Sequence, residues 1–308
     1  MAQAAALYGT TDRKVSLGIG IACLSMFCYA VMESASKLLT AGYHPTQILL
    51  FRIVVALVIV AILAQGRGGW AVIRSSRPGL QALRSVLGCA SMMASIFAYS
   101  VLPLADVLAV VYSAPILVTV LSVPILGEVV GARRSIAAAV GFIGVLLVVQ
   151  PGRALADPMV ALPLIGMVCY ALAVTLTRLA ARSDPSVTTL LYTQLAFLVI
   201  CLPFQPFVWT TPTGGDLLLF AVVAASGALG QLFLTLAYSS SPPAVIAPFD
   251  YTTIFWATLL GFAIWGHVPG DQSLLGMAII VMSGVYIALR ELRLNRKAKA
   301  RGPGPAHR

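Results

Sequence analysis

The chain has 308 residues, of which 59% are hydrophobic and only 10% carry a charge. A water-soluble domain carries about 25% charged residues, because its surface must be solvated, so this composition excludes an ordinary soluble fold. The net charge of +10 would suit a nucleic-acid-binding protein, but the basic residues lie in short loops and at both ends of the chain, as the positive-inside rule predicts for membrane proteins. We therefore expect a lipid bilayer, and no nucleic acid, as a partner.

Long apolar runs separated by short polar breaks follow one another along the whole chain. Each run is close to the roughly 20 residues that a helix needs to cross the hydrocarbon core. A β-barrel is disfavoured, because its strands alternate apolar and polar residues over about ten positions. The pattern predicts an all-α integral membrane protein with ten transmembrane helices, near 17–39, 46–65, 80–100, 106–124, 135–150, 158–181, 187–206, 215–239, 244–264 and 273–291.

The positions of the arginines predict the orientation in the membrane. Arg13 and Lys14 before an apolar run resemble a secretory signal, but that run contains Glu33 and Lys37, so we expect it to be retained as the first helix. With the N-terminus in the cytoplasm, the outward loops hold little beyond Arg153, and both termini are cytoplasmic. The loops on the cytoplasmic side then hold Arg67, Arg74, Arg77, Arg133, Arg134 and Arg182.

One segment of the first half of the chain recurs in the second half. Residues 98–128 and 237–267 align without a gap, and five positions match or correspond at one constant offset. The first helix supports the match, because Cys28-Tyr29-Ala30 corresponds to Cys169-Tyr170-Ala171 at an offset only two residues longer. The corresponding residues of the long segment are Ala98, Tyr99, Pro103, Gly127 and Glu128, followed by Ala237, Tyr238, Pro242, Gly266 and His267.

This duplication divides ten helices into five plus five. An odd number of helices in each half means that the second half enters the membrane in the opposite sense, which gives two inverted repeats. We expect a first repeat at 15–151, a second repeat at 157–291 and a basic cytoplasmic tail at 292–308.

Five segments carry a family resemblance: FRIVVA (51–56), RPGLQALRSVLG (77–88), LPLADVLAVVYSAPILVTVLSVPILGE (102–128), GFIGVLLVVQPG (141–152) and APFDYTTIFWATLLGFAIWG (247–266). Their order and spacing resemble the drug/metabolite transporter superfamily in its ten-helix EamA branch. The resemblance covers about 15 to 290, and 77–152 is most similar to bacterial riboflavin or S-adenosylmethionine importers. It implies a carrier of the bacterial cytoplasmic membrane with a central cavity between the repeats. The sequence departs from the family pattern at the end of the second repeat, which is Gly266-His267 rather than Gly-Glu.

Ionisable side chains inside the membrane are candidates for substrate binding or coupling, because each costs about 2.5–3.5 kcal/mol on insertion scales. Glu33 and Lys37 are four residues apart, so they either form a structural ion pair or leave Glu33 as a protonatable carboxylate facing the cavity. Arg52 could pair with Glu33 or hold an anionic group. Asp250 is a binding candidate or a structural polar residue, and Arg84 is expected to extend to the cytoplasmic interface.

Aromatic residues and the two repeat ends complete the candidate site. Tyr112, Tyr251 and Phe255 could line a cavity for a planar ligand, although such residues often serve packing. Glu128 could form a gate with the basic loop that follows it, or a solvated pair there. His267, on the opposite side, is either a surface residue or a second gate residue.

Other functional classes lack their signatures. The chain contains no nucleotide-binding G-x-x-x-x-G-K-[ST], no H-E-x-x-H and no G-x-S-x-G, so an intramembrane enzyme is disfavoured and we expect no cofactor and no metal site. A channel would show a filter-like polar loop or charged ring. The sequence favours a secondary transporter that moves a small organic, cofactor-like metabolite by alternating access, with protons as a candidate coupling ion. Export of amino acids or drug-like compounds is the alternative.

Overall fold

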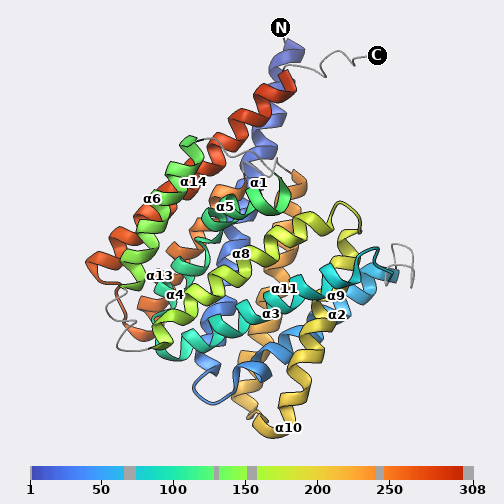
Figure 1. The fold of residues 1–308 in the computed structure, drawn as a ribbon, viewed down its shortest axis with the longest axis vertical. Coiled ribbons are helices and arrows are strands. Elements are labelled where there is room, and N and C mark those ends of the chain that lie inside the picture. Colours follow the sequence, from blue (N-terminus) through green and yellow to red (C-terminus); the bar gives the residue numbers. More distant parts are fainter. Residues whose placement is uncertain (1, 66–73, 128–131, 151–157, 241–245, 301–308) are drawn as a thin grey trace.

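The computed structural model describes residues 2–65, 74–127, 132–150, 158–240 and 246–300 (Figure 1). Within these ranges every regular element is a helix and no strand occurs. The helices are α1 (Ala2–Leu39), α2 (Pro45–Gln65), α3 (Pro78–Val101), α4 (Leu104–Val111), α5 (Ala114–Leu126), α6 (Ala132–Val149), η2 (Pro158–Ala161), α8 (Leu162–Ala180), α9 (Ser186–Cys201), η3 (Leu202–Phe204), α10 (Gln205–Val208), α11 (Gly214–Ser240), η4 (Ala247–Tyr251), α13 (Thr252–Trp265) and α14 (Asp271–Ala300).

The helices have the lengths and composition of a polytopic membrane protein. Seven segments of at least 18 residues are apolar enough to cross a bilayer, and α6 and α14 contain shorter apolar helices at Ser135–Val149 and Asp271–Ile287. With the apolar α13, they correspond to the ten predicted spans. Large apolar side chains stay exposed on the outer faces, for example Phe207 at 87% and Val199 at 70%, as lipid-facing positions require. The predicted all-α membrane fold is confirmed.

The two halves pack around a two-fold relation. In Figure 1, α1 lies along α11, and the equivalent helices α8 and α3 lie against each other. Two helices contact their own counterparts in the other half: α2 packs against α9, and α6 packs against α14. Both ends of the chain emerge at the same end of the molecule (Figure 1), and we call this the terminal end and the opposite one the distal end.

Two predicted spans are interrupted, which corrects the continuous helices expected at 106–124 and 244–264. The fourth span breaks at Tyr112–Ser113 between α4 and α5, and the ninth changes from η4 to α13 after Tyr251. Pro115 explains the first break, because it has no N–H to donate to the carbonyl of Val111, and its ring would clash with that carbonyl in a continuous helix. Breaks near the middle of a membrane span are typical of transporter binding sites.

Equivalent side-chain hydrogen bonds stabilise the two interruptions. The Ser113 hydroxyl donates to the carbonyl of Val110 at 2.6 Å, and the Thr252 hydroxyl donates to the carbonyl of Phe249 at 2.7 Å. Ser113 and Thr252 occupy equivalent positions of the repeat, as do their acceptors. The repeat therefore encodes the breaks as well as the helices.

The repeat ends are also equivalent. Gly127 and Gly266 follow α5 and α13 with φ of 70° and 64°, the left-handed conformation that glycine adopts without steric cost. Each glycine N–H donates back into its helix, to Val123 at 3.2 Å and to Phe262 at 2.9 Å, as in common helix C-caps. The glycines that the repeat comparison paired are thus the helix stops. The helix α1 begins at Ala2, before the first predicted span at 17–39.

The helices α6 and α14 cross in very close contact. A Cβ atom on Gly144 would lie 2.8 Å from the carbonyl oxygen of Gly276, and one on Gly276 would lie 2.7 Å from that of Gly144. Only glycine at both positions allows the two backbones to approach this closely.

Arg84 is buried, not extended to the interface as predicted. Its side chain is 6% exposed, and its Nε donates to Gln81 Oε1 at 2.6 Å. One terminal nitrogen donates to the Thr193 hydroxyl at 2.8 Å and also to the carbonyl of Thr189. Polar groups of α3 and α9 thus replace water around the guanidinium, so burial does not leave its donors unsatisfied.

Next to this arginine, Asp184 connects the turn between α8 and α9 to the start of α3. It accepts hydrogen bonds from the Ser76 N–H at 2.8 Å, from Gln81 Nε2 at 2.7 Å and from the Ser75 hydroxyl. Burial raises the pKa of Asp184, but these hydrogen bonds outweigh it and lower the pKa to about 2.

We expect Asp184→Asn to lower the thermal stability of the purified protein at pH 7, because the amide has one acceptor oxygen fewer for these donors. In the wild-type protein, the ionised Asp184 carboxylate stabilises the folded state, because its pKa is lower in the folded than in the unfolded chain. This stabilisation should be complete above the unfolded pKa of about 4 and should disappear as the pH falls towards about 2. Thermal unfolding in detergent from pH 7 to pH 3 would check this. If both proteins lose stability equally on acidification, Asp184 is not the group responsible.

Candidate substrate cavity

A cavity of about 300 Å³ lies between the two halves, beside both helix interruptions. Its lining comes from α1, α2, α3, α4, α8, α11 and η4, so both repeats contribute. We call it the central cavity.

The central cavity brings together three of the predicted charged residues. Glu33 of α1, Arg52 of α2 and Asp250 of η4 all line it. Glu33 accepts a hydrogen bond from the Tyr99 hydroxyl at 2.8 Å and interacts electrostatically with Arg52. Asp250 Oδ1 is buried and has no hydrogen-bond partner among the described residues. An unsatisfied buried acceptor is costly, so Asp250 suits a ligand donor or a proton.

Lys37 does not pair with Glu33, which corrects that alternative. Its Nζ donates to the carbonyl of Tyr99 at 2.7 Å and to that of Leu102. The Tyr99 carbonyl is available because its helical partner would be the N–H of residue 103, and Pro103 has none. Glu33 therefore faces the central cavity without its expected lysine partner.

The aromatic lining differs from the predicted set. Tyr112 lines the central cavity as expected, together with Tyr29 and Tyr170. The Tyr29 hydroxyl donates to Gln231 Oε1 at 3.0 Å across to α11. Tyr29, Tyr170 and Gln231 were not predicted as site residues. The repeat could have identified the two tyrosines as site residues, because Tyr29 and Tyr170 occupy equivalent positions in the two halves. Equivalent residues that point inward meet near the two-fold axis.

Tyr251 and Phe255 are not among the residues that line the central cavity. Tyr251 is 6% exposed and packs on α14, where a Cβ on Gly284 would overlap its hydroxyl. Phe255 is 62% exposed on the outer face of α13. At about 100° per residue, Tyr251 and Phe255 lie on other sides of the helix than Asp250, which does line the cavity.

The two gate candidates have different outcomes. Glu128 lies outside the described residues. His267 is exposed and lines a second cavity of about 310 Å³, which also touches Lys37, Leu102, Thr258 and Trp265. This cavity lies at the distal end, where the turn between α3 and α4 and the end of α13 meet, and we call it the distal vestibule.

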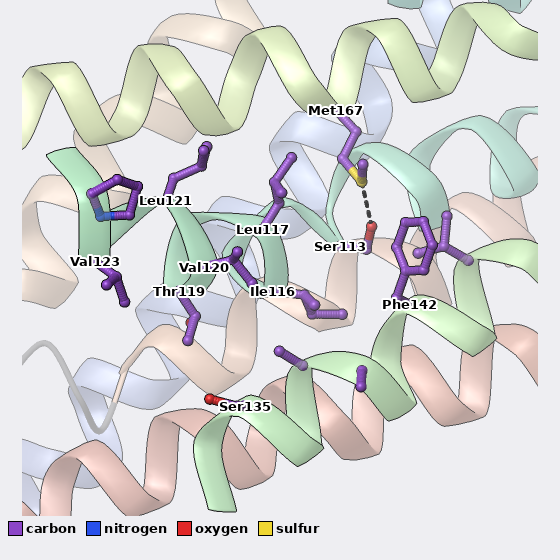
Figure 2. Close-up of a pocket in the computed structure, with 14 residues that line it drawn as sticks. Ser113, Ile116, Leu117, Thr119, Val120, Leu121, Val123, Ser135, Phe142 and Met167 are labelled. Carbon is purple, nitrogen blue, oxygen red and sulfur yellow. Dashed lines mark hydrogen bonds between the residues drawn. The ribbon is translucent and has the colours of Figure 1, made fainter. Parts of the chain in front are cut away.

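A larger cavity of about 630 Å³ is a poor candidate for a metabolite site. It lies among α5, α6 and α8, and Figure 2 shows its mostly aliphatic lining with the Ser113 hydroxyl donating to Met167 Sδ at 3.1 Å. No ionisable side chain occurs among the described residues that line it. Its flanks, such as Val120 and Phe142, are about half exposed, so it opens on the lipid-facing side and cannot recognise a charged group.

Two equivalent halves, interrupted helices and a polar cavity between them define a membrane transporter of small molecules. The chain belongs to the EamA-like transporter family, whose model matches residues 16–150 and 158–290.

Several relatives match over most of the chain. An S-adenosylmethionine uptake transporter of Rickettsia felis is 24% identical, with 91% of this chain and 95% of the relative covered. A riboflavin transporter of Rhizobium johnstonii is 28% identical over 75% of this chain and 77% of its own length. An uncharacterized transporter of Helicobacter pylori is 26% identical, with 90% and 96% covered. The resemblance predicted from the sequence is confirmed.

A solved crystal structure has the same fold. It superposes with a TM-score of 0.62 at 20% identity and covers 91% of this chain and 98% of its own. The family and the named relatives identify the protein as a multi-pass membrane transporter of small metabolites.

Proposed function

We propose that this protein is a secondary transporter for a cofactor-like metabolite, moved by alternating access through the central cavity, and that S-adenosylmethionine fits this cavity better than riboflavin does. The proposal depends on one observation: two carboxylates and one guanidinium line the cavity beside three tyrosine rings. The transporter acts in a bacterial cytoplasmic membrane with both termini in the cytoplasm, as the arginine distribution predicts.

The charges complement S-adenosylmethionine group by group. This metabolite carries an ammonium, a sulfonium and a carboxylate, which match Glu33, Asp250 and Arg52 in number and sign. Arg52 can bind a carboxylate through two parallel hydrogen bonds. Tyrosine faces attract a cation that lacks hydrogen-bond donors, such as a sulfonium, and can stack on the adenine ring.

Riboflavin is planar and uncharged, so it would stack on the tyrosines but leave these ionisable groups without partners of opposite charge. Desolvated charges without partners are costly. Free amino acids, the substrates of the alternative exporter function, would pair with Arg52 and one carboxylate and leave the tyrosines and the other carboxylate unused. The charge pattern therefore supports the adenosyl sulfonium class.

The decisive experiment measures uptake by the purified protein in proteoliposomes. Labelled S-adenosylmethionine, riboflavin and methionine are supplied with and without a pH gradient, and empty liposomes serve as the control. We expect S-adenosylmethionine to accumulate. S-adenosylhomocysteine, which lacks the sulfonium charge, should compete about tenfold less well, because a desolvated cation–π contact is worth up to about 2 kcal/mol.

Other outcomes decide against the proposal. Accumulation of riboflavin alone would assign the flavin, and accumulation of methionine alone would favour the amino-acid alternative. If no compound accumulates or exchanges under any gradient, none of these substrates belongs to this transporter. A pH gradient that drives uptake would support protons as the coupling ion.

A further inference from the structure

The charged residues of the central cavity do not follow the two-fold relation of the repeats. Glu33 and Arg52 line the cavity from the first half, and Asp250 lines it from the second half. The position equivalent to Asp250 in the first half is Val111, which also lines the cavity. The position equivalent to Glu33 in the second half is Val174. Equivalent helices therefore give the cavity two chemically different sides.

The side formed by the first half carries both signs of charge. Glu33 interacts electrostatically with Arg52 and accepts the hydrogen bond that the Tyr99 hydroxyl donates at 2.8 Å. A carboxylate binds the ammonium of a ligand, and a guanidinium binds a carboxylate through two parallel hydrogen bonds. The amino and carboxylate groups of an α-amino acid, which share one carbon atom, thus find opposite charges side by side. We call Glu33, Arg52 and Tyr99 the zwitterion subsite.

The surroundings of Asp250 consist mainly of aromatic rings. Asp250 Oδ1 is buried and has no hydrogen-bond partner among the described residues. Three tyrosines that line the same cavity interact electrostatically with this carboxylate: Tyr29, Tyr112 and Tyr170. The Tyr29 hydroxyl donates to Gln231 Oε1 at 3.0 Å, which fixes the position of this ring. Asp250 therefore places one negative charge beside three rings.

Rings and a single carboxylate suit a cation without hydrogen-bond donors better than an ammonium. An ammonium has three N–H donors, and each donor that is buried without an acceptor is costly. A sulfonium or a quaternary ammonium, together called onium cations, has no such donors. Tyrosine faces attract an onium cation, and the attraction of a nearby carboxylate is stronger inside a protein than in water.

We propose that Asp250 and these three tyrosines form an onium subsite, so that the cavity recognises an α-amino acid with an onium cation in its side chain. The amino-acid head binds the zwitterion subsite, and the onium cation lies against Asp250. Both carboxylates interact electrostatically with the same two rings, Tyr29 and Tyr112, so the two subsites are neighbours and a short side chain joins them.

The adenosyl group of S-adenosylmethionine then adds stacking but is not required for binding. This inference rests on the proposed function, because it divides the same cavity into subsites. It goes further in fixing the orientation of the substrate and in extending recognition to smaller onium amino acids.

The test compares two ligands that differ by one methyl group on sulfur. S-methylmethionine carries a sulfonium and methionine carries the uncharged thioether, and neither has an adenosyl group. Binding of each to the purified full-length protein in detergent is measured by isothermal titration calorimetry. We expect S-methylmethionine to bind about thirtyfold more tightly, because the rings and the Asp250 carboxylate attract only the charged form.

Substitutions at the two subsites should have different effects. Asp250→Asn keeps the shape and removes the charge, so it should reduce the preference for S-methylmethionine to about threefold. It should change methionine binding less than about twofold, because methionine uses only the zwitterion subsite. Glu33→Gln should weaken both ligands equally. Asp271→Asn, at an exposed acid in the first turn of α14, is the matched control and should keep the full preference.

Tyr170 provides the test if Asp250→Asn does not fold. Its side chain is 42% exposed, so a substitution there removes little packing. Tyr170→Leu should lower the preference for S-methylmethionine, whereas Tyr170→Phe keeps the ring and should keep the preference. A purely structural role of Tyr170 would not separate the two ligands.

Several results would overturn the proposal. These are equal binding of the two ligands by the wild-type protein, binding of neither, and an unchanged preference in both Asp250→Asn and Tyr170→Leu. Equal weakening of both ligands in Asp250→Asn would overturn it as well, because Asp250 would then bind the amino-acid head.

The proposed function fails by a different result. If S-methylmethionine binds with the expected preference but S-adenosylmethionine does not enter proteoliposomes, the onium subsite is supported and another onium amino acid is the substrate. Uptake of S-adenosylmethionine without any preference for S-methylmethionine would support the proposed function and overturn the onium subsite.

Discussion

Replacing Glu33 with glutamine should lower the initial rate of substrate uptake in proteoliposomes about 100-fold, because removing one of the interacting charges in a desolvated cavity costs about 2–5 kcal/mol. Glutamine has the same shape and still accepts the hydrogen bond that the Tyr99 hydroxyl donates at 2.8 Å. The substitution therefore removes only the charge and the titratable proton. It leaves the Arg52 guanidinium in the same cavity without the carboxylate with which it interacts.

The measurement is initial uptake and counterflow exchange in the same proteoliposomes. Loss of both would assign Glu33 to substrate binding, and loss of gradient-driven uptake with exchange retained would assign it to proton coupling. Asp271→Asn is the matched control, because Asp271 is an exposed acid in the first turn of α14 and should leave both rates unchanged. Wild-type rates in Glu33→Gln, with normal elution on gel filtration, would make Glu33 a structural residue.

The class of fold could be predicted because the membrane restricts the choice. A bilayer requires long apolar helices, and the repeat at 98–128 and 237–267 fixed the two-fold relation before any contact was known. Glu33, Arg52 and Asp250 could be identified one by one, because an ionisable group inside an apolar run is rare. Their meeting in one cavity depends on the packing of α1, α2 and η4, which helix spacing alone does not give.

Each correction has a physical cause. The spacing of four residues made a pair between Glu33 and Lys37 one of two alternatives, but the Lys37 ammonium binds the carbonyls of Tyr99 and Leu102 instead. Arg84 was placed at the interface because its partners, such as Thr193, come from a helix distant in sequence. Phe255 lies five residues after Asp250, about 140° further around the helix axis, and it is exposed on the outer surface instead of lining the cavity. For Lys37 and Arg84, a backbone acceptor or a remote partner decided the outcome.

Replacing Gly276 with alanine should destabilise the whole protein, by about 3 kcal/mol. The added Cβ would lie 2.7 Å from the Gly144 carbonyl oxygen, 2.8 Å from Val148 Cγ2 and 3.0 Å from the Val148 backbone nitrogen. Two of these three atoms belong to the backbone of α6, so no rotamer change can relieve the contact. The helices α6 and α14 must separate, and their crossing joins the fifth span of each half to its equivalent.

Gly20→Ala is the matched control for this prediction. Gly20 also lies inside a long helix, but a Cβ there would meet nothing within 4 Å, so alanine should be neutral or stabilise the protein by about 0.5–1 kcal/mol through its higher helix propensity. Thermal unfolding and monodispersity in detergent would be compared for both variants. An equal midpoint for Gly276→Ala and Gly20→Ala would mean that α6 and α14 do not cross at this distance. A selective loss of stability in Gly276→Ala would instead support the close approach of the two backbones at this crossing.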